Sequence, residues 1–167
     1  NVIIDKTQTG DAASYRFGIS GGLLFFYNGT TAVFSAGTIP LKTFSQVAFT
    51  LDGTTNTLKF YINGALDSRD LIGLGAPNAA AVTVGRDIQG RYFQGQLDEV
   101  QVYNTSLNSG QLQALYRAGA QASPVLLNAW NAEGNALEAS GASRGAVAGD
   151  VSYTPGVSGL AFPFGDA

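Results

Sequence analysis

The chain has 167 residues and contains neither cysteine nor histidine, which excludes disulfides, thiolate or imidazole metal sites, and nucleophiles activated by histidine. Nine scattered basic residues against twelve acidic ones give a net charge of −3, so we expect no nucleic-acid partner. No apolar run approaches the roughly 18 residues of a membrane helix, so we also expect no membrane insertion.

Short segments with alternating or continuous apolar character fill the first hundred residues, and glycine, asparagine and proline separate them. Such segments are typical of strands joined by tight turns. The expected strands are residues 2–4, 15–19, 23–27, 31–35, 47–51, 58–62, 65–68, 82–85 and 92–103. Asn63-Gly64 predicts a type I′ hairpin turn, because that turn needs positive φ at both central residues. Residues 71–81 are rich in glycine, proline and alanine and are expected to form a loop.

One helix is expected after the last of these strands. Asn108 or Ser109 can cap it, Leu112, Leu115 and Tyr116 share one face, and Gly119 can end it. Beyond it, residues 126–130 and 160–164 have strand character. The whole pattern predicts an all-β fold, an antiparallel jelly-roll β-sandwich with one short helix after the closing strand.

Two motifs carry a resemblance to a known family. Residues 46–53 (QVAFTLDG) and 58–64 (LKFYING) resemble the central hairpin of laminin-G-like domains, which have a concanavalin A-like jelly-roll fold. Residues 95–104 (GQLDEVQVYN) resemble the strand that closes such a domain. The family's histidine before the central hairpin is replaced by Gln46, so any role of that imidazole is absent.

A third segment resembles the opening of the same domain, yet it lies at the C-terminal end. It comprises residues 130–141 (WNAEGNALEASG) and residues 153–166. We therefore interpret residues 1–119 as the later part of a sandwich, 120–124 as a linker and 125–167 as opening strands that complete this sandwich or a neighbouring one. A permuted monomer, a subunit joined by exchanged strands and a fragment of a tandem array all remain open.

The resemblance also implies a structural calcium site between the closing strand and the opening segment. Ca²⁺ prefers six to eight oxygen ligands, so backbone carbonyls would supply several. The candidate ligands are Asp98, Glu133, Gly134, Glu138 and Asp166. The alternative for Asp98 is a purely local role, in which its carboxylate accepts backbone N–H groups at a turn.

A ligand-binding surface is expected near turns that carry aromatic and charged side chains. Sugar rings stack on exposed aromatic faces, and binding residues often lie in loops such as the one before the closing strand. The candidates are Tyr27, Arg86, Asp87, Arg91, Tyr92 and Phe93. The alternatives are that the aromatic residues belong to the core and that the charged residues are simply solvated.

Catalysis is disfavoured because no pair of carboxylates has the spacing of a glycosidase. Asp98 and Glu99 are adjacent on a strand and point to opposite faces. The leading hypothesis is therefore a non-catalytic, secreted or surface-displayed adhesion module that binds an extracellular glycan or protein, stabilised by calcium. The alternative is a structural subunit that polymerises into filaments by strand exchange.

Overall fold

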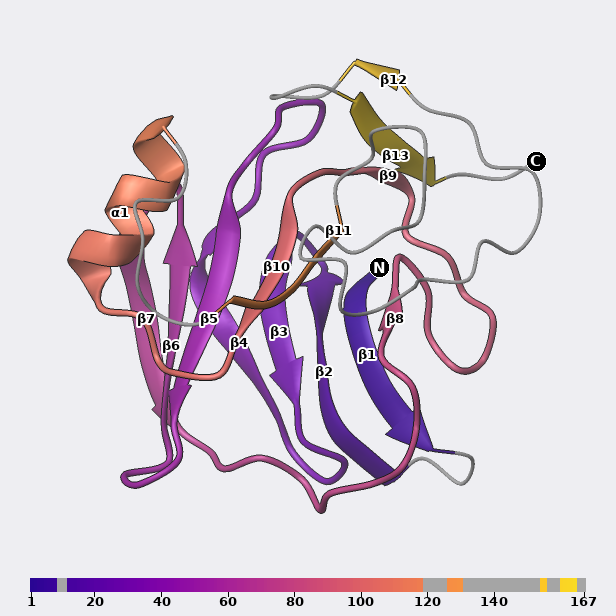
Figure 1. Cartoon of the computed structure of the whole chain (residues 1–167), viewed down its shortest axis with the longest axis vertical. Coiled ribbons are helices and arrows are strands. Elements are labelled where there is room, and N and C mark those ends of the chain that lie inside the picture. The colour runs from indigo at the N-terminus through magenta and orange to yellow at the C-terminus, as the bar shows by residue number, and fades with distance from the viewer. Residues whose placement is uncertain (9–11, 119–125, 131–153, 156–159, 165–167) are drawn as a thin grey trace. The chain divides into compact units, whose positions relative to one another are not determined.

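The computed structural model describes residues 1–8, 12–118, 126–130, 154–155 and 160–164 (Figure 1). The chain divides into two compact units. The first unit comprises Asn1–Tyr92 and Ser106–Ala122, and the second comprises Phe93–Thr105 and Ser123–Ala167.

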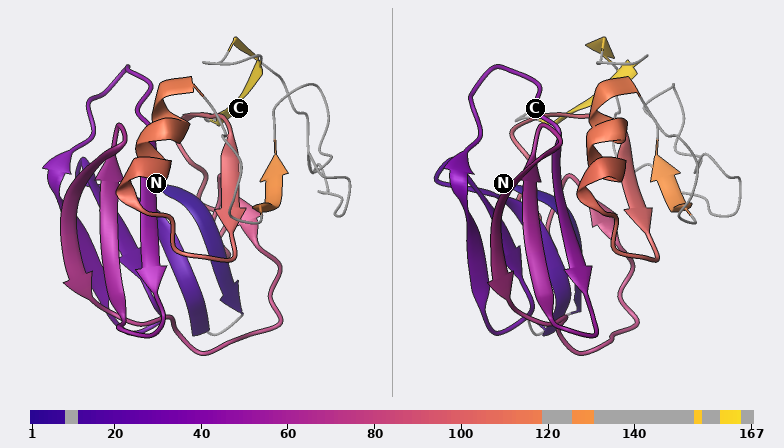
Figure 2. Two further views of the ribbon diagram at one scale, coloured as in Figure 1. Left: turned by 60° about the vertical axis from the view of Figure 1, so that its left-hand side comes forward. Right: turned by 90° about the vertical axis from the view of Figure 1, so that its left-hand side faces the viewer.

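Two antiparallel sheets form the first unit. Five strands in the order β4-β3-β2-β1-β8 form one sheet: β1 (Val2–Gln8), β2 (Ala12–Ser20), β3 (Leu23–Tyr27), β4 (Ala32–Thr38) and β8 (Thr83–Val84). The other sheet has the order β5-β6-β7: β5 (Val47–Asp52), β6 (Thr57–Ile62) and β7 (Ala65–Leu71). Figures 1 and 2 show these sheets as two layers, with α1 (Ser109–Ala118) beside β7. The all-β sandwich with a single helix among the described residues confirms the predicted fold class.

The core of the first unit lies between its two sheets. Phe49 on β5 contacts Phe17 on β2 and Phe26 on β3, with a distance of 5.0 Å between ring centroids in each pair. Leu24, Phe26, Leu58 and Phe60 are completely buried. Successive side chains of a strand point to opposite faces of the sheet. The neighbours of these four residues along β3 and β6 therefore lie on the outer faces of the two sheets.

Turn and cap residues behave locally as expected. Asn63 and Gly64 have φ angles of 52° and 74°, which confirms the type I′ geometry of the β6–β7 turn. Asn108 caps α1: its Oδ1 accepts the Gln111 N–H at 3.0 Å, while Gln111 Oε1 accepts the Asn108 N–H at 2.9 Å. The side chain of Leu112 on the helix is buried.

The second unit contains the closing motif and the described strands of the C-terminal segment. Its strands are β9 (Gly95–Leu97), β10 (Val100–Tyr103), β11 (Leu126–Trp130), β12 (Thr154–Pro155) and β13 (Leu160–Phe164). β10 pairs antiparallel with β11, and β13 pairs antiparallel with both β9 and β12. The strands that resemble the opening of the family's domain therefore pair with strands of the closing motif in the same chain.

Candidate functional site

The loop between β8 and β9 forms a tight, closed turn within the first unit. Arg86 and Tyr92 face each other in an antiparallel bridge, which closes the loop at its base. Inside it, the Asp87 N–H donates to the Arg91 carbonyl and the Gly90 N–H donates to the Asp87 carbonyl, both at 3.1 Å. Gly90 has a φ of 77°, a conformation that favours glycine and allows the chain to reverse there. We call residues 85–92 the bridge loop.

The Asp87 carboxylate stabilises the bridge loop by accepting hydrogen bonds from other residues of the same loop. Its side chain is buried, and its Oδ1 accepts the N–H groups of Gln89 at 2.9 Å and Arg91 at 3.0 Å. Its Oδ2 accepts the Arg91 Nε–H at 2.5 Å. Burial alone would raise the pKa of Asp87, but the hydrogen bonds and the positive charge from Arg91 outweigh it and hold this pKa below its ordinary value.

A row of polar side chains crosses the five-stranded sheet on the face opposite the core. Asp5 on β1 lies opposite Arg16 on β2, which in turn lies opposite Tyr27 on β3. Arg16 Nε is 3.3 Å from Asp5 Oδ1, and its guanidinium carbon is 5.8 Å from the centroid of the Tyr27 ring. The Thr7 hydroxyl also donates to Asp5 Oδ1. Asp5 and Arg16 are 1 % and 8 % exposed, so this is a buried ion pair rather than a solvated one.

The polar row and the bridge loop are joined by one hydrogen bond. The Ile88 N–H donates to Asp5 Oδ2 at 3.3 Å. The Thr83 hydroxyl, on β8 opposite Asp5, donates to the Arg86 carbonyl at 3.0 Å. The sheet therefore fixes the loop at two points, and the loop in turn covers the Asp5 carboxylate.

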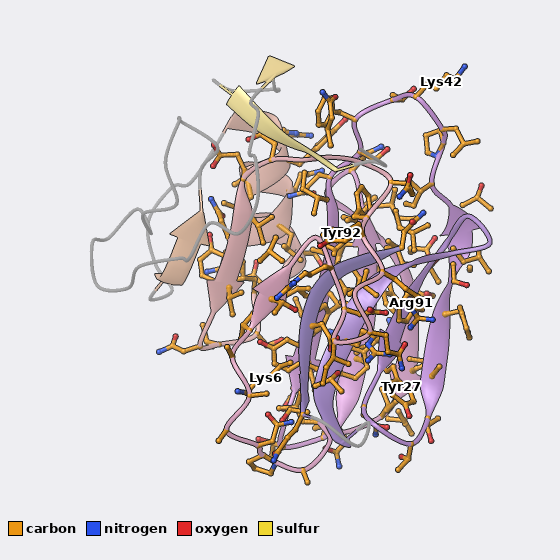
Figure 3. All side chains as sticks on the ribbon, turned by 90° about the vertical axis from the view of Figure 1, so that its right-hand side faces the viewer. Lys6, Tyr27, Lys42, Arg91 and Tyr92 are labelled. Carbon is orange, nitrogen blue, oxygen red and sulfur yellow. The ribbon has the colours of Figure 1, made fainter. Side chains whose placement is uncertain are left out.

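A cavity of about 260 Å³ lies where β1, β8 and the bridge loop meet. Its polar and charged lining residues are Asp5, Thr7, Thr83, Arg86 and Asp87. Beside this cavity, the loop presents exposed side chains: Arg91 is 67 % exposed, Tyr92 54 % and Ile88 41 %. Figure 3 shows Arg91, Tyr92 and Tyr27 from this side of the molecule.

The structure brings four of the six predicted ligand-binding residues into one loop: Arg86, Asp87, Arg91 and Tyr92. Tyr27 lies on β3 and is connected to them through Arg16 and Asp5. Two residues differ from the expectation of an accessible binding surface. Asp87 is buried as the internal support of the loop, and Phe93 is buried with 8 % of its surface exposed.

Sequence reasoning missed Asp5, Arg16 and Ile88. Asp5 follows the apolar run of residues 2–4, and an acidic residue at that position is ordinarily expected to face solvent. The available signal was the pair of opposite charges on the first two strands, Asp5 and Arg16. The register that places Asp5 opposite Arg16 is set by the pairing of β1 with β2 and does not follow from the local sequence pattern.

The predicted calcium ligands lie mostly outside the described residues. Of the five, only Asp98 is described, and its Oδ1 accepts the N–H of Glu99 at 3.0 Å, in a turn where Glu99 has a φ of 49°. Glu133, Gly134, Glu138 and Asp166 are outside the described ranges. Among the residues that are described, no three acidic side chains gather closely enough to hold a metal ion. The calcium site stays a prediction.

Within the described part of the chain, α1 is far too short and too polar to cross a bilayer, and no other helix qualifies.

Comparison with known proteins gives the class to which this fold belongs. Residues 1–113 match the laminin G family model described as the concanavalin A-like lectin/glucanases superfamily, and the chain belongs to this superfamily. The match confirms the resemblance predicted from residues 46–64 and 95–104, while the resemblance of the C-terminal segment to the opening of the domain stays a prediction. A search of curated proteins finds no match.

Two solved structures are similar to the chain. One is described as a candidate carbohydrate-binding protein from Bacteroides ovatus, with a TM-score of 0.66 and 24 % sequence identity. The match covers 84 % of this chain and 45 % of that protein, so the chain spans less than half of its length. The other is an S-layer domain-containing protein from Clostridium thermocellum, with a TM-score of 0.41 and 21 % identity over 70 % of this chain and 62 % of that one.

Proposed function

We propose that the chain is a non-catalytic recognition module, secreted or displayed at the cell surface, that binds an extracellular glycan through the bridge loop. The observation that carries this proposal is a loop whose backbone is locked by the buried Asp87 while Tyr92, Arg91 and Ile88 remain exposed. We call Arg86, Ile88, Arg91 and Tyr92 the loop surface.

The chemistry of the loop surface suits a sugar. An exposed aromatic ring offers an apolar face to the C–H groups of a pyranose, and guanidinium groups donate to its hydroxyls. The loop is held in place before any ligand arrives, so less conformational entropy is lost on binding. The name of the Bacteroides ovatus neighbour, which refers to carbohydrate binding, agrees with this choice but concerns that protein.

The carboxylates beside the cavity are engaged in ways that favour binding over catalysis. Asp5 is paired with Arg16 and accepts from Thr7 and Ile88, and Asp87 is fully used by Gln89 and Arg91. A general acid has to exchange its proton with the substrate, which a carboxylate saturated by internal donors does poorly. An assay for glycan hydrolysis tests this point: turnover that disappears in Glu99→Gln would overturn the non-catalytic assignment.

The central experiment measures binding to a broad panel of immobilised glycans, using the whole chain and two matched variants. Tyr92→Ala removes the exposed ring of the loop surface. Tyr116→Ala removes an aromatic residue of similar exposure, 50 %, from α1. We expect Tyr92→Ala to lower glycan affinity by about fivefold or more, taking the gain of about 1–3 kcal/mol known for a nucleobase that stacks on an aromatic side chain as a guide for a sugar ring. Equal losses in both variants, or no binding to any glycan, would contradict the proposal.

We also propose a structural calcium ion held by Asp98 with oxygens of the C-terminal segment. A bound ion stabilises the folded state by an amount that grows with its concentration over its Kd. Thermal melts with added calcium and with a chelator should therefore differ in midpoint. Identical midpoints would remove calcium from the proposal and leave the loop surface unaffected.

The alternative proposal is a structural subunit that polymerises by strand exchange. The observation that favours it is the pairing of β11 with β10 and of β13 with β9, because the same antiparallel pairs could form between neighbouring chains. Light scattering over a concentration series tests it. A constant monomer mass would eliminate the polymer, while mass that rises with concentration would support exchange.

A further inference from the structure

The cavity beside the bridge loop has a charge arrangement that points to one class of ligand. Two of its lining residues are acidic, and each is already neutralised by an arginine: Asp5 by Arg16, and Asp87 by Arg91. Arg86 also lines the cavity and is exposed. No carboxylate of the described residues forms an ion pair with its guanidinium. After these two ion pairs are counted, the positive charge of Arg86 is the one that stays unbalanced among the described lining residues. This local charge is opposite in sign to the net charge of the chain, which is −3.

The position of this arginine relative to Tyr92 adds a second observation. Arg86 and Tyr92 are directly opposite each other in an antiparallel bridge. Directly opposed residues project their side chains to the same side, with Cβ atoms about 4.5–5.5 Å apart. An arginine that forms no ion pair with any described carboxylate and a 54 %-exposed aromatic ring thus stand next to each other on a loop that the sheet holds fixed.

A uronic acid sugar combines the two features that this pair can recognise. Its ring has an apolar face that can stack on an aromatic side chain, and its carboxylate projects from the edge of the same ring. A planar guanidinium binds a carboxylate through two parallel hydrogen bonds. We propose that the loop surface binds acidic polysaccharides, with a uronate ring on Tyr92 and its carboxylate on Arg86. This inference rests on the proposed glycan-binding function and adds the class of sugar.

Arg91 has a secondary role in this proposal, and Arg86 is the residue that binds the carboxylate. Its Nε–H is committed to Asp87, so its charge is balanced, although its side chain is 67 % exposed. Its Nη groups can still donate to hydroxyls of a neighbouring sugar unit. Affinity for the carboxylate is therefore expected to depend on Arg86 more than on Arg91.

The test compares acidic oligosaccharides with their neutral counterparts. The probes are oligomers of galacturonate, of alginate and of a glucuronate polymer, each paired with the same oligomer after chemical reduction of its carboxyl groups. We expect at least one acidic probe to bind about tenfold or more tightly than its reduced form, because a hydrogen bond to a charged group contributes that much. The preference should shrink with added salt, since the site is exposed and the charges are screened.

Variants assign the preference to the named residues. Arg86→Gln should weaken binding of the acidic probe much more than binding of the reduced probe, so that the preference between the two probes is lost. Arg69→Gln, which removes an exposed arginine on β7, is the matched control and should retain the preference. Melting curves confirm that both variants fold, which is expected because Arg86 accepts the Thr83 hydroxyl through its backbone carbonyl and not through its side chain.

The outcomes separate this inference from the proposed function. If acidic and reduced probes bind equally and Tyr92→Ala weakens both, glycan recognition stands and the uronate assignment is wrong. If the acidic preference survives in Arg86→Gln, the assignment to this cavity is wrong. If no probe and no other glycan binds, both proposals fall together.

Discussion

The five-stranded sheet has buried side chains on both of its faces, but they are buried by different means. On the inner face, Leu24 and Phe26 are completely covered and Phe26 packs against Phe49 of the opposite sheet. On the outer face of neighbouring strands, Asp5 and Arg16 are almost as inaccessible, yet they are charged and paired with each other. The inner face is covered by a second sheet, whereas on the outer face the bridge loop lies against the Asp5 carboxylate, to which the Ile88 N–H donates.

This difference shows which face of the sheet fixes the position of neighbouring segments most strictly. Apolar packing gains free energy in proportion to buried area and tolerates changes of shape. A buried ion pair gains little net stability, but it penalises any arrangement that leaves one partner alone. The outer face therefore specifies the position of the bridge loop more strictly than it stabilises the fold.

The largest effect is expected from Phe26→Ala on the inner face. Removing a fully buried ring leaves a cavity between the sheets, and we expect the free energy of unfolding to fall by about 3–5 kcal/mol. Urea denaturation at pH 7 measures it. A loss below about 1 kcal/mol would show that the inner face is not the core that the ring contacts indicate.

Arg16→Met on the outer face should cost nearly as much, about 3 kcal/mol, because it leaves the buried Asp5 carboxylate without its cation. The double variant Asp5→Asn with Arg16→Met should be more stable than Arg16→Met alone, since no unpaired charge remains. Denaturation of the two single variants and the double variant gives the coupling energy. Strictly additive effects would contradict the ion pair.

Asp87→Asn should cost about 2 kcal/mol at pH 7, because a charged acceptor of three hydrogen bonds becomes neutral. The pKa of Asp87 is lowered in the folded protein, so its contribution is complete above the unfolded value of about 4 and is lost as the pH falls through the folded value. Unfolding at a series of pH values from 7 to 2.5 should show the gap between the two proteins narrowing below about pH 4. A gap independent of pH would assign the loss to geometry instead.

The smallest effect is expected from Phe34→Ala, on the outer face but away from the ion pair. Phe34 is 47 % exposed and touches Phe25 with a centroid distance of 6.4 Å. Losing this tilted pair should cost about 1 kcal/mol. The same denaturation assay applies, and a loss comparable to that of Phe26→Ala would show that the outer face has an apolar core of its own.

Most of the local structure could be predicted from residues that are close together in the sequence. The Asn63-Gly64 turn, the cap at Asn108 and the alternation that buries Phe17 and Phe26 depend on neighbours a few positions away. The motifs of residues 46–64 and 95–104 identified the superfamily for the same reason, because each is a continuous stretch. Four of the six predicted ligand residues lie within eight positions of one another in the sequence, so their placement in one loop could also be predicted.

The sequence by itself therefore determined most of the strands, the turns, the helix and the superfamily of this protein, since all of these follow from local patterns. The predicted strand over residues 92–103 is wrong at one point: it is interrupted at Asp98 and Glu99, which lie between β9 and β10 and not on a strand. The tertiary structure alone decided that Asp5 and Asp87 are buried and that Arg86 forms no ion pair with a carboxylate in the described part of the chain. The burial of Asp5, for example, depends on the bridge loop returning to β1, where Ile88 donates its N–H to a residue 83 positions earlier in the chain. Alternation assigns a side chain to one face of a strand, but only the folded chain decides what covers that face.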